Sequence, residues 1–263
     1  ALPLRQTFSL TVYNGNPAGA EHIVSTLLQA YCREHMELFI VRRNFNSIYA
    51  DGSDLLQQLQ AQTKVTLFEQ DKETGLQELF ERLMAIMGER MQLRNEFVQQ
   101  NGLTRGDPQN TVRAFEYIHA HSTPLMVIFE NYYEFAKSLY DGQAVMFAEL
   151  FRAQDPNTTS KKNNGYGYNI YYTACFGPGE YTLTAAQTPM ADCFNPQKFT
   201  LMFGGQLDKC GAVPLPRDYL AINEPDEHYN HCVMYYQGRL AGLSLPCGEL
   251  VHVEPDPDEV PII

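Results

Sequence analysis

The chain has 263 residues, 44% of them hydrophobic, which is enough apolar sequence for one large core or two modest ones. Its formal net charge is −12, and its only basic pairs are Arg42–Arg43 and Lys161–Lys162. Nucleic acid is therefore an unfavourable partner, because DNA-binding proteins neutralise phosphates with a basic surface. No run approaches the roughly 20 apolar residues of a membrane-spanning helix. The first residues already predict a strand, so we expect a piece of a longer protein.

The first third of the chain alternates between strand and helix signals. An apolar, β-branched run predicts a strand that ends at Gly15, and apolar residues at helical spacing predict a helix over 20–35. Short apolar runs predict strands over 36–43 and 64–70, with a short helix over 53–62 between them.

The middle third contains the strongest helix signal. Residues 72–102 repeat apolar side chains at helical spacing, and Gly102 is placed to end the helix. We expect the methionines of this helix to fill the core rather than to form a functional surface. A shorter helix over 111–120, a buried strand over 125–129 and a helix over 134–154, with a break near Asp141–Gly142, follow in that order.

The last third is richer in strands. A glycine-rich polar loop over 155–169 precedes a buried strand over 170–175, and residues 178–189 are ambiguous between a turn and a short helix. Further strands are predicted over 198–205, 231–246 and 249–263. This order predicts one α/β domain over residues 1–263, a three-layer, doubly wound, mostly parallel sheet with the last strands at an edge.

Cysteine and histidine spacing gives no metal site. None of the six cysteines forms a C-x-x-C pair, so we expect reduced thiols. His228, His231 and Cys232 form a loose H-x-x-H-C group, for which a polar loop before a strand is the preferred interpretation. We therefore predict no metal ligands.

The turn after the first strand reads GNPAGAEH and has the shape of a phosphate-binding loop. An ordinary strand-to-helix turn remains the simpler interpretation of this segment alone, because every α/β protein has several such turns. If it is a phosphate-binding loop, its residues are Gly15, Asn16, Pro17, Ala18, Gly19, Ala20, Glu21 and His22.

A second motif supports the phosphate-loop interpretation. Residues 127–135 read VIFENYYEF, so an apolar strand ends in Glu130 and Asn131. With the order of the segments, this run resembles the FtsK/SpoIIIE family of P-loop motor ATPases, in particular the C-terminal ATPase domain of type VII secretion ATPases (EssC/EccC). The resemblance implies a RecA/FtsK-like fold on the cytoplasmic side of a membrane-anchored parent. It also implies neighbouring ATPase domains and secreted proteins as partners.

Several positions depart from the family's motifs. A working loop reads G-x-x-x-x-G-K-[ST], whereas this chain has Ala20, Glu21 and His22 at its last three positions. A carboxylate in place of the lysine repels phosphate, and a charge pair about 4 Å apart interacts by about 4 kcal/mol at an effective dielectric near 20. We hypothesise that Glu21 itself occupies the amides of the loop. Glu130 replaces the aspartate that organises Mg²⁺, and Asn131 replaces the glutamate that activates water.

We expect, from these departures, an inactive or very weak ATPase-like domain that recognises a secreted substrate or regulates neighbouring ATPase domains, with no cofactor. Two tyrosine-rich segments, 165–172 and 228–238, are candidate binding surfaces, with half-buried edge-strand tyrosines as the simpler interpretation. The alternative is an active protein or DNA translocase that uses ATP and Mg²⁺. A third possibility is a small-molecule enzyme in which His119 and His121 act with Glu130.

Overall fold

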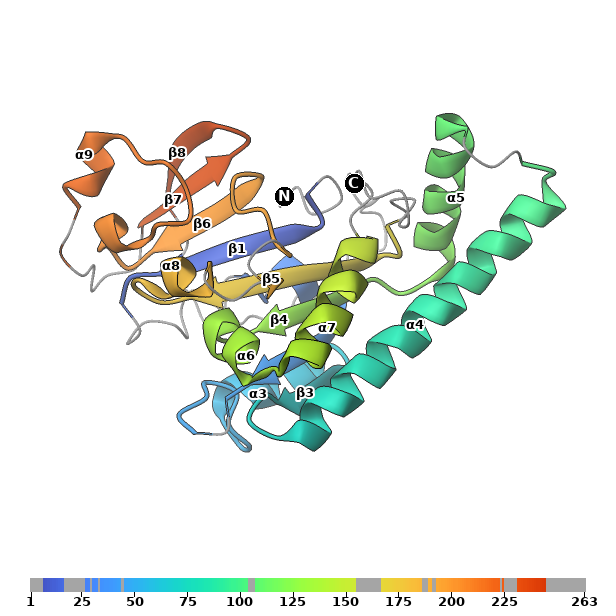
Figure 1. Ribbon diagram of the computed structural model, residues 1–263, viewed down its shortest axis with the longest axis horizontal. Coiled ribbons are helices and arrows are strands. Elements are labelled where there is room, and N and C mark those ends of the chain that lie inside the picture. Colours follow the sequence, from blue (N-terminus) through green and yellow to red (C-terminus); the bar gives the residue numbers. More distant parts are fainter. Residues whose placement is uncertain are drawn as a thin grey trace.

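A single mixed sheet organises the computed structural model shown in Figure 1. The structure describes residues 7–16, 27–28, 30–32, 34–43, 45–103, 107–154, 167–185, 189–190, 193–222, 224 and 231–244. Within these residues the strand order is β3-β2-β4-β5-β1-β6-β7-β8. The strands are β1 (Ser9–Asn14), β2 (Glu37–Arg42), β3 (Val65–Glu69), β4 (Leu125–Phe129), β5 (Ile170–Phe176), β6 (Phe199–Phe203), β7 (His231–Tyr236) and β8 (Arg239–Ser244).

The first six strands run parallel, and β7 and β8 add an antiparallel edge. All five residues of β4 and of β6 are buried, as continuously apolar strands of a parallel sheet should be when helices cover both faces. The predicted α/β class, the mostly parallel sheet and the position of the last strands at an edge are therefore confirmed.

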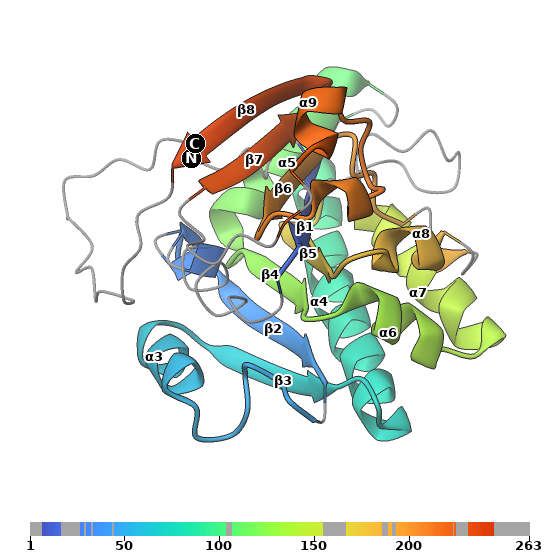
Figure 2. The ribbon, with the colours of Figure 1, turned by 90° about the vertical axis from the view of Figure 1, so that its left-hand side faces the viewer.

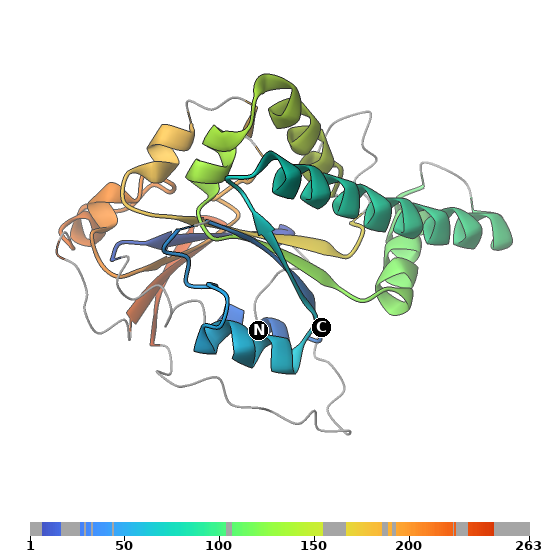
Figure 3. The same ribbon diagram turned by 90° about the horizontal axis from the view of Figure 1, so that it is seen from below.

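Helices cover both faces of the sheet (Figure 3). The long α4 lies on one face with α6 and α7, whereas α3 lies on the other face with the helical residues 27–28 and 30–32. Figure 2 shows α9 and α8 beside the β6–β8 end of the sheet. The helices are α3 (Asp54–Gln62), α4 (Glu73–Gln100), α5 (Pro108–His121), α6 (Tyr132–Ser138), α7 (Asp141–Gln154), α8 (Glu180–Thr184), the 3₁₀ helix η3 (Leu207–Lys209) and α9 (Arg217–Leu220).

Local sequence explains most of the helix boundaries. The Ser53 hydroxyl accepts from Leu56 N at the start of α3, and the Asp107 carboxylate accepts from Gln109 N at the start of α5, directly before Pro108. The expected break in the helix over 134–154 is real, since α6 ends at Ser138 and α7 begins at Asp141. The ambiguous segment 178–189 contains the short α8.

The methionines of α4 correct one expectation. Met87 is partly buried against the core, but Met84 and Met91 are 43% and 40% exposed, so they do not fill the core. The core face of α4 is carried by Leu76, Leu79 and Leu83. Methionines and leucines both recur at helical spacing along α4. The positions of the neighbouring elements decide which of these side chains are buried.

No helix in the described part of the chain is long and apolar enough to cross a membrane. The predicted strand over 249–263, residues 155–166 of the predicted loop, and most of the predicted helix over 20–35 lie outside the described residues.

Candidate functional site

The carboxyl ends of β1, β4 and β5 meet at one edge of the sheet. β5 lies between the other two strands and pairs with both of them in parallel. Gly15, Glu130 and Gly177 directly follow these three strands, so the fold brings the start of the phosphate-loop candidate and the Glu130–Asn131 pair to the same edge. This edge is where open α/β sheets bind their ligands.

Gly15 is held against the turn that follows β6. Its N–H donates to the Phe203 carbonyl at 2.7 Å, and its own carbonyl accepts from the Gln206 side-chain amide at 2.9 Å. A Cβ at Gly15 would lie 2.0 Å from the Gly205 carbonyl oxygen, so no other residue fits there. The first loop position is therefore a packing position as well as a candidate ligand position.

The remainder of the loop cannot be placed. Asn16 is described, and its N–H donates to the Asn14 side chain at 3.2 Å. The predicted site residues Pro17, Ala18, Gly19, Ala20, Glu21 and His22 lie outside the described residues. The prediction that the Glu21 carboxylate occupies the amides of the loop therefore stays a prediction.

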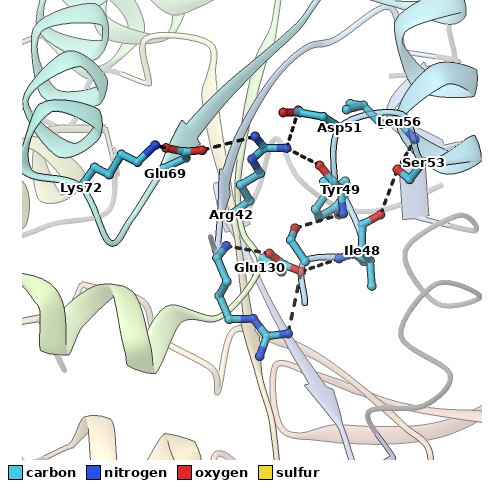
Figure 4. Close-up of polar contacts among 11 residues, drawn as sticks. Arg42, Ile48, Tyr49, Asp51, Ser53, Leu56, Glu69, Lys72 and Glu130 are labelled. Carbon is cyan, nitrogen blue, oxygen red and sulfur yellow. Dashed lines mark hydrogen bonds and ion pairs between the residues drawn. The ribbon is translucent and has the colours of Figure 1, made fainter. Parts of the chain in front are cut away.

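Glu130 points into the β2–α3 connection, as Figure 4 shows. One oxygen of its carboxylate accepts from the Arg43 N–H and the other accepts from the Ile48 N–H, both at 2.9 Å. The Arg43 guanidinium is 3.9 Å from the same carboxylate, and the Glu130 side chain is only 5% exposed. Two backbone amides and a cation thus replace the water that a buried carboxylate loses.

Arg42 fixes the far side of the same connection (Figure 4). Its guanidinium donates to the Tyr49 carbonyl at 2.6 Å and to the Asp51 carboxylate at 2.8 Å, and it lies 3.5 Å from Glu69. The hydrogen bond to Asp51 raises the pKa of Arg42, and the same contact lowers the pKa of Asp51. Glu69 is also paired with Lys72. Glu130 and Arg42 therefore hold this connection at Arg43, Ile48, Tyr49 and Asp51.

The oxygen and the NH₂ group of the Asn131 side chain both form hydrogen bonds. Its oxygen accepts from Glu134 N at 2.9 Å as the N-cap of α6, and its NH₂ group donates to the Glu180 carboxylate at 2.9 Å. The other Glu180 oxygen accepts from Gly177 N after β5. We did not predict Glu180 as a site residue. Its sequence signal is weak, since it is 49 residues from Asn131 and starts a five-residue helix.

Cys175 lies near both carboxylates at this edge. Burial, followed by the negative charges of Glu130 and Glu180, raises the pKa of its thiol to about 12. A nucleophilic cysteine needs a lowered pKa, so this thiol is not activated. The five cysteines in the described residues (Cys32, Cys175, Cys193, Cys210 and Cys232) are free, in agreement with the expected reduced thiols.

The two histidines of the third interpretation lie at the opposite edge of the sheet. His121 is the last residue of α5 and contacts the Tyr117 carbonyl, and His119 is 3.3 Å from the Tyr171 hydroxyl. β4 then runs from Leu125 to the Glu130 edge, about 16 Å away at about 3.3 Å per residue. The enzyme that would combine these histidines with Glu130 is therefore excluded.

Metal-binding groups are not found in the described part of the chain, where no cluster of three or more His, Cys, Asp or Glu residues could hold an ion. In the H-x-x-H-C group, Cys232 is buried in β7, whereas His228 lies outside the described residues.

Comparison with known proteins supports the fold. No protein-family model and no curated protein matches the sequence. Among solved structures, the pCW3 conjugation coupling protein TcpA, in a monomer form with ATPγS, aligns with a TM-score of 0.58 and 11% identity over 94% of this chain. The cytoplasmic domain of EssC aligns with a TM-score of 0.56 and 8% identity over 94% of this chain.

A third similar structure is that of ATPases 2 and 3 of Thermomonospora curvata EccC with a signal sequence peptide, with a TM-score of 0.53 and 14% identity over 93% of this chain. The chain spans 62% of the TcpA chain, 40% of the EssC chain and 39% of this EccC chain. The chain therefore has the fold of secretion and conjugation ATPase domains. These are the kind of protein that the sequence resemblance named, so the predicted P-loop ATPase fold is confirmed.

Proposed function

We propose that the chain is a catalytically inactive ATPase-like domain of a secretion or translocation motor, which acts by binding rather than by hydrolysis. The observation that carries this proposal is the hydrogen bonding and burial of the Glu130 carboxylate. Its carboxylate oxygens accept from the backbone amides of Arg43 and Ile48, and its side chain is 5% exposed. A carboxylate that organises a metal must present an oxygen to it, and this one faces the protein interior.

The residues at this edge do not fit ATP·Mg²⁺. In P-loop ATPases the metal is held by an acidic residue after the strand and a hydroxyl in the loop. Here the acidic residue is hydrogen-bonded to the β2–α3 connection, and the sequence has His22 at the hydroxyl position and Glu21 at the lysine position. The amide of Asn131 accepts no proton, so it cannot activate water.

Glu180 favours the second candidate, an active ATPase. Its carboxylate stands beside Asn131 at the same edge, where a residue that takes a proton from water would lie. In the structure both of its oxygens are hydrogen-bonded, one to Asn131 and one to Gly177, which is why we prefer the inactive domain.

The proposed partners follow from the proteins that share the fold. One of those structures contains two ATPase domains and a signal sequence peptide, and another is a cytoplasmic domain. By analogy, this chain would lie on the cytoplasmic side of a membrane-anchored parent and would bind a secreted protein or a neighbouring ATPase domain. This step rests on fold alone, and fold does not determine activity.

Calorimetry with ATP and Mg²⁺ tests the proposal. We expect no magnesium-dependent heat of binding at millimolar nucleotide and no phosphate release above the buffer rate. Glu130→Gln and Glu180→Gln are the paired variants. Micromolar, magnesium-dependent binding that Glu130→Gln abolishes would disprove the inactive domain, and hydrolysis that Glu180→Gln abolishes would establish the second candidate.

A further inference from the structure

The outer edge of β8 is an unpaired strand edge. Figure 2 shows β8 as the last strand of the sheet, and within the described residues it pairs with β7 alone. Its register with β7 is unbroken from Arg239 to Ser244, so no bulge bends the strand away from its plane. An edge of this kind presents backbone N–H and C=O groups to which another strand can bind.

The turn between β7 and β8 determines which backbone groups face outward. Gln237 and Gly238 form a two-residue turn with positive φ angles of 47° and 84°. Gln237 N donates to Lys198 O at 3.2 Å, on the β6 side of β7. Successive residues of a strand direct their N–H and C=O groups to opposite sides, so Tyr236 directs its own to β8, where it is paired with Arg239.

The same alternation continues along β8. Hydrogen-bonded and non-hydrogen-bonded pairs follow one another in an antiparallel ladder, so every second residue of β8 bonds to β7. The residues between them direct their N–H and C=O groups to the open edge, and they are Leu240, Gly242 and Ser244.

The two edges of the sheet differ in how they are protected. Charged side chains flank the β3 edge, since Lys64 before β3 is paired with Glu37, and Glu69 at its end is paired with Lys72. Such charges discourage the addition of another strand. Residues 240–244 at the other edge read LAGLS and contain neither a charged residue nor a proline. The β8 edge therefore lacks the features that keep edge strands apart.

We propose that β8 pairs in an antiparallel direction with β8 of a second copy of this chain, about a two-fold axis at Gly242. This register gives three hydrogen-bonded pairs, because Leu240 faces Ser244 of the second copy, Gly242 faces Gly242, and Ser244 faces Leu240. Registers centred on Ala241 or Leu243 would give two such pairs within β8. Two-fold pairing of one surface with itself is the commonest arrangement of protein dimers.

The side chains of β8 fit this register. Leu243 lies opposite Ala241 of the second copy, so a large side chain faces a small one in the close, non-hydrogen-bonded pair. Both residues are only partly buried in the single chain, so pairing covers apolar surface that is open to water.

Charge at the edge also permits the pairing. Arg239, the charged residue of β8, is six positions along the ladder from Arg239 of the second copy, a separation of about 20 Å. This exceeds the screening length of about 8 Å at physiological salt. The formal net charge of −12 on each chain opposes association at long range, so the dimer should become tighter as salt is raised.

This inference goes beyond the proposed function, because it holds whether or not the chain binds nucleotide. In the sheet, β5, β1, β6 and β7 lie between β8 and β4, the strand that Glu130 follows.

Sedimentation equilibrium of the full chain tests the proposal. We expect the average mass to rise from one chain toward two between about 1 µM and 1 mM, and to do so at lower concentration when salt is raised. A mass that remains that of a single chain at 1 mM would overturn the proposal.

A charge swap at Gly242 tests the register. Gly242 is exposed and a Cβ there would meet no atom within 4 Å, so Gly242→Lys and Gly242→Glu leave the single chain undisturbed. Each variant alone places like charges opposite each other and should weaken the dimer about tenfold. An equal mixture of the two variants should associate at least as tightly as the unchanged protein, because Lys then faces Glu.

The matched controls are Gly88→Lys and Gly88→Glu. Gly88 is also exposed with open space around it, but it lies on α4, so these variants should dimerise like the unchanged protein. Equal weakening by the Gly88 variants, or a mixture of the Gly242 variants that stays as weak as each one alone, would place the contact elsewhere and overturn the proposal.

Hydrogen exchange separates a second copy from other occupants of the edge. The amides of Leu240, Gly242 and Ser244 should exchange quickly at concentrations where the chain is monomeric and slowly where it is dimeric. The amides of Ala241 and Leu243, which bond to β7, should be protected in both states. Protection of the outward amides in the monomer would mean that another segment of the same chain covers the edge, and the proposal would be wrong.

Discussion

Two buried ions at opposite edges of the sheet, Glu130 and Arg90, are held in the same way. The Arg90 guanidinium donates to the carbonyls of Tyr168 and Thr123 at 2.5 and 2.6 Å, and burial lowers its pKa to about 10. Glu130 accepts from two backbone amides. Each charge is therefore compensated mainly by backbone dipoles. Those at Arg90 belong to the segments that lead into β4 and β5, and those at Glu130 belong to the segment that follows β2.

The difference between the two ions lies in their positions. Arg90 ties together the segments that lead into β4 and β5, where no chemistry is expected. Glu130 directly follows β4, and P-loop ATPases hold Mg²⁺ with an acidic residue after a strand. The comparison teaches that a carboxylate at a catalytic position is informative only when its oxygens are free, and that Glu130 behaves as a structural ion.

The largest expected effect is that of Arg90→Ala. It leaves two carbonyls without a donor and removes the packing of a long side chain, so we expect a loss of about 4 kcal/mol of unfolding free energy. Urea denaturation followed by circular dichroism measures it. Arg82→Ala on the exposed side of the same helix is the control and should change the stability by less than about 0.5 kcal/mol.

Glu130→Ala comes next, because it leaves the Arg43 and Ile48 amides buried without an acceptor. We expect a loss of about 3 kcal/mol. Hydrogen exchange should speed up at these two amides first. Since β4 separates Glu130 from Arg90 by about 16 Å, the two losses should add to within about 0.5 kcal/mol. A stability loss below that of an exposed Asp51→Asn control would show that Glu130 is not a structural ion.

Asn131→Asp extends the comparison to the neighbouring residue. The carboxylate would still cap α6, but it would face the Glu180 carboxylate instead of donating to it. We expect a loss of about 2 kcal/mol at neutral pH from the lost charge-assisted hydrogen bond and the added repulsion. Adding Glu180→Gln should restore most of the stability. An unchanged melting temperature in Asn131→Asp would contradict the contact.

The smallest expected effect is a loss of folding stability at alkaline pH. The folded-state pKa of Cys175 is raised to about 12, so the unfolded chain releases this proton first and stability falls as pH rises above about 9. For one thiol the loss between about pH 9 and 10 is about 1 kcal/mol. Cys175→Ala should reduce the slope of stability against pH by that amount. An identical slope in both proteins would rule out the buried thiol as its source.

The sequence was sufficient for the positions of Glu130 and Asn131 at a strand end, because five consecutive apolar residues followed by polar ones identify a buried parallel strand. It could not show what Glu130 binds, since the donors are backbone amides, which every residue has. Glu180 was missed because its contact with Asn131 depends on tertiary folding. From the sequence alone, Arg90 cannot be distinguished from the exposed charged residues of α4. Its burial follows from its contacts with the segments that lead into β4 and β5.

The close approach at Gly15 has a consequence for how such loops change over time. A side chain there would collide with the Gly205 carbonyl whether or not a phosphate is ever bound, and Gly204 and Gly205 keep backbone angles that favour glycine. In the inactive domain that we propose, the packing at this position alone would be enough to retain the glycine. At the lysine and hydroxyl positions of the motif, by contrast, the sequence carries Glu21 and His22.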